Sequence, residues 1–273
     1  MFQHGGQCTR SGLVVAALWT SLHGVAALAH DFWMEPETYR AAVGTKVPLR
    51  LLVGADFKGD STVFNAEWFE RYVAIGADGE QPVAGSLGDE PAGTITVKGP
   101  GLYTVGYFSK KFDVKFDSFT KFKEYLEQEG LERHLVLAQF RAGSGGTIQE
   151  IYSRCAKSLI AGPRAEADTT QRRIGCPLEL FPETNPYRQN DLQLRLLYQD
   201  KPLEGALVVA FNKADPLAKL KARTDRDGRV TFKLPRSGTW LVTSVHMIAT
   251  ARFVRADWES FWASLTFELP AVK

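Results

Sequence analysis

The sequence has few of the residues on which most enzymes and disulfide-rich proteins depend. Its 273 residues include only three cysteines and five histidines. It has no Gly-x-Ser-x-Gly nucleophile turn, no His-Glu-x-x-His zinc motif and no glycine-rich loop of the dinucleotide-binding type. Because no pairing of a nucleophile with a base is recognisable, we predict that the protein is not an enzyme.

An excess of charge of one sign is also missing. The chain carries 33 Lys and Arg against 31 Asp and Glu, a formal net charge of +2. No acidic or basic tail stands out, and a nucleic-acid-binding surface normally requires a strong local excess of Lys and Arg. We therefore predict no nucleic-acid partner.

Long apolar runs are confined to the first 29 residues, which we interpret as a signal peptide (1–29). Arg10 supplies a short positive region, an apolar stretch follows, and Ala27-Leu28-Ala29 provides a small-x-small cleavage triplet. Cleavage between Ala29 and His30 would release a periplasmic or secreted protein with no membrane span. The alternative is an uncleaved anchor helix, because residues 11–29 are nearly long enough to cross a bilayer.

Cleavage at this point would place a histidine at the N-terminus of the mature chain. His30 would then offer two nitrogen donors, its imidazole and its free α-amine, whose ordinary pKa is about 8. The two nitrogens of one residue can close a chelate ring on a transition-metal ion. Export would thus create a bidentate ligand from a residue of the chain interior.

The cysteines suggest one disulfide. Cys8 would leave with the signal peptide, so Cys155 and Cys176 remain as an even pair in an oxidising compartment. A bridge between them would close a loop of about 20 residues and stabilise the fold by about 3 kcal/mol. Two free thiols are the alternative. Neither cysteine has a Cys or His neighbour at zinc spacing.

Alternating apolar residues and turn signals predict a mostly β protein with two β-sandwich domains of the immunoglobulin-like or transthyretin-like type. We assign the N-terminal sandwich to residues 30–111 and the C-terminal sandwich to residues 175–273. The predicted strands lie at 47–53, 71–75, 94–97, 102–108, 192–198, 206–211, 221–225, 229–234 and 238–246.

Residues 112–174 have a different pattern and are predicted to be a helical linker or insert. Apolar residues from Phe119 to Ala138 recur at helical spacing, and the glutamates between them suggest a solvent-exposed face. We predict a second helix at residues 148–160, ending before Gly162-Pro163.

Two resemblances support this division. The segments Lys201–Ala206 and Thr224–Pro235 resemble a carboxypeptidase regulatory-like or transthyretin-like sandwich, which implies a fold and no activity. The whole mature chain resembles the domain-of-unknown-function family 4198. The segments that carry this resemblance are Ala29–Pro36, Gly101–Tyr107, Tyr152–Lys157, Pro177–Leu180, Val245–Met247 and Trp258–Phe267.

Members of that family are secreted proteins of Gram-negative bacteria, often labelled as periplasmic components of nickel or cobalt transport. The resemblance implies a transition-metal ion (Ni, Co, Cu or Zn) as ligand. It also implies an envelope transporter or outer-membrane receptor as a possible partner.

A metal held by His30 needs at least one further donor. His246, within the Val-His-Met segment of the resemblance, is the first candidate, because only His30, His134 and His246 remain after signal removal. The alternative for His246 is a buried strand histidine bonded to a neighbour. We expect His134 to lie on the surface.

Three carboxylates complete the candidate metal site. Asp31 follows His30 directly, and Asp257 and Glu259 flank Trp258. Each could bind the metal or accept a hydrogen bond that fixes an imidazole, although such residues more commonly carry surface charge.

The sequence therefore predicts a periplasmic metal-ion-binding accessory protein that serves transition-metal uptake or handling. A non-enzymatic interaction or docking module of the cell envelope, without metal, is the alternative. A copper-dependent oxidase that uses the same histidine chelate is a further one.

Overall fold

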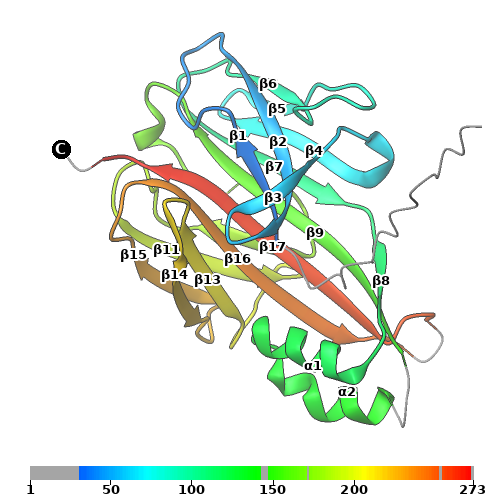
Figure 1. Cartoon of the computed structure of the whole chain (residues 1–273). Coiled ribbons are helices and arrows are strands. Elements are labelled where there is room, and N and C mark those ends of the chain that lie inside the picture. The colour runs from blue at the N-terminus through cyan, green and yellow to red at the C-terminus, as the bar shows by residue number, and fades with distance from the viewer. Residues whose placement is uncertain (1–30, 143–146, 171, 252–253, 272–273) are drawn as a thin grey trace, which may run out of the picture.

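The computed structural model describes residues 31–142, 147–170, 172–251 and 254–271 (Figure 1). Strands dominate, and a long central sheet runs through the whole molecule. This sheet has nine strands in the order β14-β13-β16-β17-β9-β7-β4-β5, with β8 paired to β9. Its strands are β4 (Phe69–Gly76), β5 (Gly79–Pro82), β7 (Leu102–Ser109), β8 (Phe112–Phe116), β9 (Ile148–Ala161), β13 (Leu207–Asn212), β14 (Asp215–Arg223), β16 (Gly238–Ala249) and β17 (Trp258–Leu269).

The N-terminal sheet covers one face of the central sheet. It consists of β1 (Asp31–Pro36), β2 (Lys46–Ala55), β3 (Lys58–Thr62) and β6 (Thr94–Thr96). Its apolar side chains pack with residues of β4, β7 and β9 into one core, to which β9 contributes Ala156 and Ile160. The Thr266 hydroxyl on β17 donates a hydrogen bond of 2.6 Å to the Met34 carbonyl, which fixes β1 on the central sheet.

The C-terminal sheet covers the opposite face. It contains β10 (Leu178–Pro182), β11 (Asp191–Tyr198), β12 (Lys201–Pro202) and β15 (Arg229–Lys233). Here β9 contributes Leu159 and Ala161. Because neighbouring side chains of a strand point to opposite faces, Ile160 and Ala161 belong to different sandwiches. The predicted mostly β fold with two sandwiches is confirmed, and the two sandwiches share one sheet.

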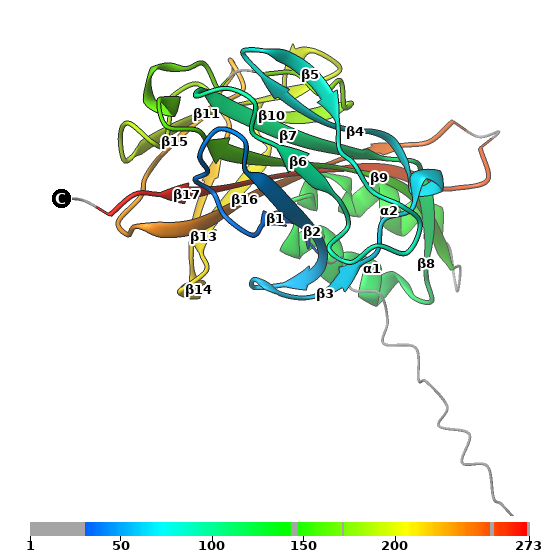
Figure 2. The ribbon, with the colours of Figure 1, turned by 90° about the horizontal axis from the view of Figure 1, so that it is seen from above.

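Two short helices pack at one end of the central sheet, on the same face as the N-terminal sheet (Figures 1 and 2). They are α1 (Phe119–Gln128) and α2 (Leu135–Ala142); the 3-10 helices are η1 (Ala66–Trp68), η2 (Glu132–His134) and η3 (Ala165–Ala167). The Ser118 side chain accepts from the Lys121 N–H and caps α1. Phe122 and Tyr125 pack against Trp258 and Trp262 of β17. The helices thus extend the core beyond the N-terminal sheet.

The helix predicted at residues 148–160 is wrong. This segment is β9, which pairs in parallel with β17 and antiparallel with β7 and β8. Its second half is buried on both sides, and a strand covered on both faces does not alternate between apolar and polar residues. The apolar pattern of residues 148–160 therefore does not indicate a strand. The pairing of β9 with distant strands determines its structure.

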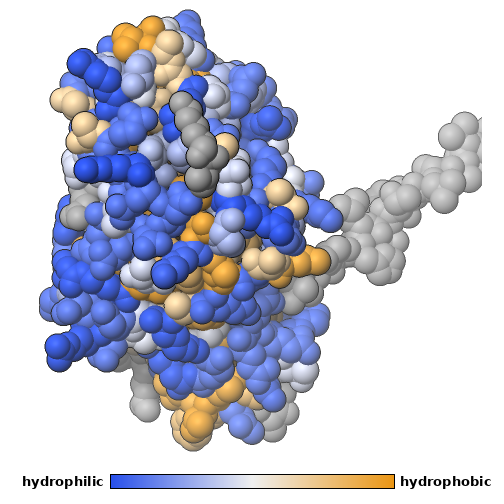
Figure 3. Space-filling model, turned by 90° about the vertical axis from the view of Figure 1, so that its left-hand side faces the viewer, coloured by the Kyte–Doolittle hydropathy of each residue, from blue (hydrophilic) through white to orange (hydrophobic). Residues whose placement is uncertain are grey.

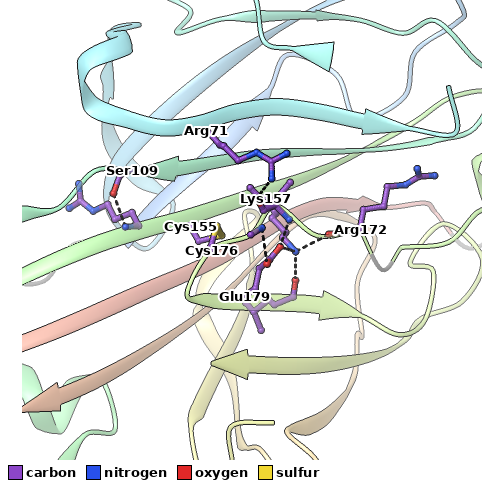
Figure 4. The surroundings of a disulfide bond; sticks show 11 residues. Arg71, Ser109, Cys155, Lys157, Arg172, Cys176 and Glu179 are labelled. Atoms are coloured by element: carbon purple, nitrogen blue, oxygen red, sulfur yellow. Dashed lines mark hydrogen bonds and ion pairs between the residues drawn. A yellow bond between two sulfur atoms is a disulfide. The ribbon is translucent and has the colours of Figure 1, made fainter. Parts of the chain in front are cut away.

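The predicted disulfide is confirmed. Cys155 on β9 is bonded to Cys176, with the two Cα atoms 6.0 Å apart (Figure 4). Beside it, Lys157 Nζ lies 2.6 Å from Glu179 Oε1, and both side chains are buried. The bridge ties the segment before β10 to the central sheet, and the ion pair ties β10 itself to it.

Within the described ranges, no helix has the length and apolar character needed to cross a bilayer. The predicted signal peptide and its cleavage site lie outside these residues.

Candidate functional site

The described chain begins at Asp31, the first residue of β1, whereas His30 lies outside the described residues. Asp31 is half-buried between the N-terminal sheet and the helical end of the molecule. The Thr243 side chain on β16 lies near its carboxyl group and favours the charged form. Burial, opposed by the Lys219 ammonium, raises the pKa of Asp31 to about 6, and the nearby Asp56 adds to the rise.

A second carboxyl group, that of Glu129, belongs to the same region. Glu129 caps the carboxyl end of α1 and is half-buried. Burial raises the pKa of Glu129 to about 8, and the next cause is the negative charge of Asp31. Lys219 and Lys221 lower it without cancelling the rise. The carboxyl groups of Asp31 and Glu129 thus share one region of the structure, and the Lys219 ammonium lowers the pKa of both.

Buried oxygen atoms without partners lie close to these carboxyl groups. Glu150, which also contributes to the raised pKa of Glu129, is only 2 % exposed. Its Oε1 accepts from the Tyr125 hydroxyl at 3.1 Å and from the Ser260 hydroxyl, but its Oε2 has no partner. Ser264, the cross-strand neighbour of Thr243, likewise has a buried hydroxyl without a partner. Such atoms are costly in a folded protein.

A third carboxyl group, that of Glu150, is also disfavoured in its charged form by burial. Burial raises the pKa of Glu150 to about 7, so a positive ion that kept the three carboxyl groups ionised would offset part of the cost of their burial. In the part of the chain that the structure describes, no group of three or more His, Cys, Asp or Glu side chains is placed to hold a metal ion. A metal here would need donors from His30.

His246 does not lie with Asp31. Thr243 and His246 are three residues apart on β16, so their side chains point to opposite faces of the central sheet. The imidazole of His246 packs 4.3 Å from the Tyr198 ring, centroid to centroid. Its Nδ1 accepts a hydrogen bond of 3.0 Å from Arg133, because an arginine can only donate. This matches the alternative of a buried, bonded strand histidine.

His134 is half-buried, although a surface position was expected. Its Nε2 accepts from Arg133 Nε at 3.2 Å, and its ring meets that of Trp258 at 5.2 Å. Burial, and then the charge of Arg133, lower the pKa of both His134 and His246 to about 4. One guanidinium therefore joins two neutral imidazoles around the edge of β16.

The other two predicted carboxylates have partners of their own. Asp257 accepts the Gln149 N–H at 2.9 Å with its side chain. Glu259 shares its face of the central sheet with His246 and forms an ion pair of 2.6 Å with Lys111. The structure thus brings His246 and Glu259 to one face, and Asp31 to the other.

No local sequence pattern identifies Glu129 and Glu150 as site residues. Glu129 was assigned to an exposed helix face, and Glu150 to the wrongly predicted helix. Their positions depend on how α1 and β9 pack against β1, which a local pattern does not report.

The family model described as "Domain of unknown function (DUF4198)" matches residues 27–248. The chain belongs to this family. No curated protein matches the chain. Among solved structures, the D0-D1 domain of intimin shares 10% sequence identity with a TM-score of 0.19, covering 86% of this chain and 96% of that one. The BSP domain of a biofilm-associated protein shares 9% identity with a TM-score of 0.19, covering 88% of this chain and 30% of that one.

Proposed function

We propose that the protein is a periplasmic metal-ion-binding accessory protein and that it serves transition-metal handling through a mature N-terminal His30. The observation that carries this proposal is the pair of half-buried carboxyl groups, Asp31 and Glu129, directly beside the position that His30 precedes. Two carboxyl groups with raised pKa values in one place call for a cation.

In this proposal the donors come from the N-terminus and from the carboxyl groups. His30 supplies its imidazole and α-amine, and Asp31 or Glu129 supplies an oxygen. A mixed nitrogen and oxygen set suits Ni²⁺, Co²⁺, Cu²⁺ and Zn²⁺ better than Mg²⁺ or Ca²⁺. His246, Asp257 and Glu259 have other partners in the structure and are left out of the set.

Metal titration of the purified mature protein tests this assignment. We expect one equivalent of metal to bind in calorimetry, and we expect His30→Ala or one extra N-terminal residue to abolish binding. Glu129→Gln should weaken binding about tenfold or more, the loss of one charged contact. Glu127→Gln is the matched control, since Glu127 is exposed on the same helix.

Equal metal uptake by wild type, His30→Ala and the extended protein would refute the assignment. N-terminal sequencing of the exported protein tests the underlying cleavage separately. A mature protein that begins anywhere other than at His30 would remove the chelate on which the proposal depends.

One observation favours a second candidate, a docking module of the cell envelope without metal. Helix α2 exposes Val136 and Phe140 at 84% and 85% of their surface, and apolar surface gathers at this end of the molecule (Figure 3). Exposed apolar patches commonly mark contact sites. Val136→Glu with Phe140→Glu should then abolish the protein's envelope association while leaving its fold and stability unchanged. Unchanged association would exclude this patch as the docking surface.

A further inference from the structure

A cavity of about 200 Å³ opens between the N-terminal sheet and the β7–β8–β9 end of the central sheet. Its walls are largely aromatic: Phe32, Trp68, Tyr107, Phe112 and Tyr152. The rings of Phe32 and Tyr107 lie 5.2 Å apart, and those of Phe112 and Tyr152 lie 5.8 Å apart. Arg154 of β9 is the one charged residue among the described residues that line the cavity.

Among the described residues, the guanidinium of Arg154 has aromatic neighbours but no hydrogen-bond acceptor. It lies 5.3 Å from the centre of the Phe32 ring and 4.9 Å from that of Tyr152. Its Nε is buried without a hydrogen-bond partner, and no described carboxylate or carbonyl accepts from its side chain. The Arg154 backbone N–H donates to Ser109 Oγ at 2.8 Å, so the strand beneath the cavity is held in place.

Several other arginines of the fold have carboxylate partners. Seven of them form ion pairs with carboxylates: Arg40 with Glu166, Arg71 with Glu80, Arg172 with Asp168, Arg173 with Asp200, Arg223 with Glu132, Arg229 with Glu183, and Arg236 with Asp215. The Nε atom of Arg154 is buried, and burial lowers the pKa of the guanidinium. Leaving a buried guanidinium without an acceptor costs free energy, which an anion from outside would recover.

We propose that this cavity binds a small organic monocarboxylate with a flat apolar body, the carboxylate on Arg154 and the body between the aromatic rings. A single guanidinium without a second cation matches one carboxylate, which it can contact through two parallel hydrogen bonds. The volume is below the range of about 300–1,000 Å³ that holds drug-sized ligands, so the ligand is small. The site needs neither His30 nor a metal ion, and it goes beyond the metal-handling function.

Calorimetry with 3-phenylpropionate on the mature protein in EDTA tests the proposal. We expect saturable binding of the acid with a Kd at or below about 1 mM, and binding of 3-phenylpropionamide weaker by about tenfold or more. That difference follows because a hydrogen bond to a charged partner contributes more than one to a neutral amide. Equal binding of acid and amide, or no saturable binding of the acid, would overturn the proposal.

Variants separate the ligand site from a packing role of Arg154. Arg154→Met should remove binding of the acid. Thr62 also lines the cavity, and Thr62→Trp should fill it and block binding while leaving Arg154 in place. Arg40→Met is the matched control, because Arg40 also lies over an aromatic ring, Tyr187 at 5.0 Å, but has an acid partner. If both cavity variants fold and bind the acid as wild type does, the cavity is not the site.

Discussion

Lys157 Nζ and Glu179 Oε1 lie 2.6 Å apart in the interior, where the central sheet meets the C-terminal sheet. Lys157 is 1% exposed, and burial lowers its pKa to about 8. Its ammonium also donates to the Arg172 and Leu180 carbonyls, each at 3.1 Å, and lies 3.9 Å from the centre of the Phe181 ring (Figure 4). The pair therefore has nearly all of its hydrogen-bonding capacity satisfied.

Lys157→Met should destabilise the protein by about 3–5 kcal/mol in urea denaturation, because it leaves the Glu179 charge buried without its partner. Lys157→Met combined with Glu179→Gln should recover part of that loss. Lys111→Met is the control, since its ion pair with Glu259 is largely exposed on the lysine side and should contribute less than about 1 kcal/mol. A Lys157→Met protein as stable as wild type would show that the buried pair contributes nothing.

We expect removal of the disulfide to lower the stability of the protein by a similar amount. Cys155 and Cys176 are 21 residues apart in sequence, and closing such a loop restricts the unfolded chain. Replacing both by Ala should lower the free energy of unfolding by about 3 kcal/mol. The same shift should appear when wild type is reduced before thermal denaturation. Two reactive thiols in denatured, exported protein would contradict the bond.

We expect Glu150 to make the stability of the protein depend on pH. Burial raises its pKa from 4.5 to about 7, so the folded protein binds more protons at this site than the unfolded chain does between these values. Stability should therefore fall as the pH rises from 4.5 to 7, by up to roughly 3 kcal/mol relative to Glu150→Gln. Urea denaturation of both proteins across this range measures the difference. Parallel stability curves would show that Glu150 is ionised at no cost.

Strands in which apolar and polar residues alternate could be predicted from the sequence, because this alternation is a local pattern. Residues 47–53 and 192–198 each lie within an observed strand with about the predicted bounds, because mainly one face of each meets a core. Residues 102–108 also lie within an observed strand, β7, although this strand is buried on both faces. For β9 no such pattern exists, since both of its faces are covered. The shared sheet itself follows from the β17–β9 pairing, which joins residues about 108 positions apart.

The candidate site could be predicted only in part, for a similar reason. Asp31 was identified because it follows the cleavage triplet, a signal carried by neighbouring residues. Glu129 was missed, since its burial and its interactions with Asp31 of β1 and Lys219 of β14 arise only in the folded structure. His246 was placed on its strand correctly, but the face to which it points depends on the register of β16, which the sequence does not reveal.

Burial, and after it the charge of Arg133, keeps His134 and His246 neutral, which gives a final prediction. Arg133→Met should raise the pKa of both imidazoles from about 4, because the charge of Arg133 is the second cause of their lowering. Both values should stay below 6.5, since burial is the larger cause and is retained. Histidine side-chain NMR shifts across the pH range report each pKa, and Lys123→Met on the exposed face of α1 is the control.

His134 and His246 also determine how the stability of the protein changes at acidic pH. A histidine whose folded pKa is lowered binds fewer protons folded than unfolded, so wild type should lose stability as the pH falls from 6.5 to 4. In Arg133→Met the two folded pKa values move closer to the unfolded value, so this part of the loss should shrink. Unchanged histidine pKa values in the variant would mean that burial alone keeps the imidazoles neutral, and that the guanidinium acts only as a hydrogen-bond donor between them.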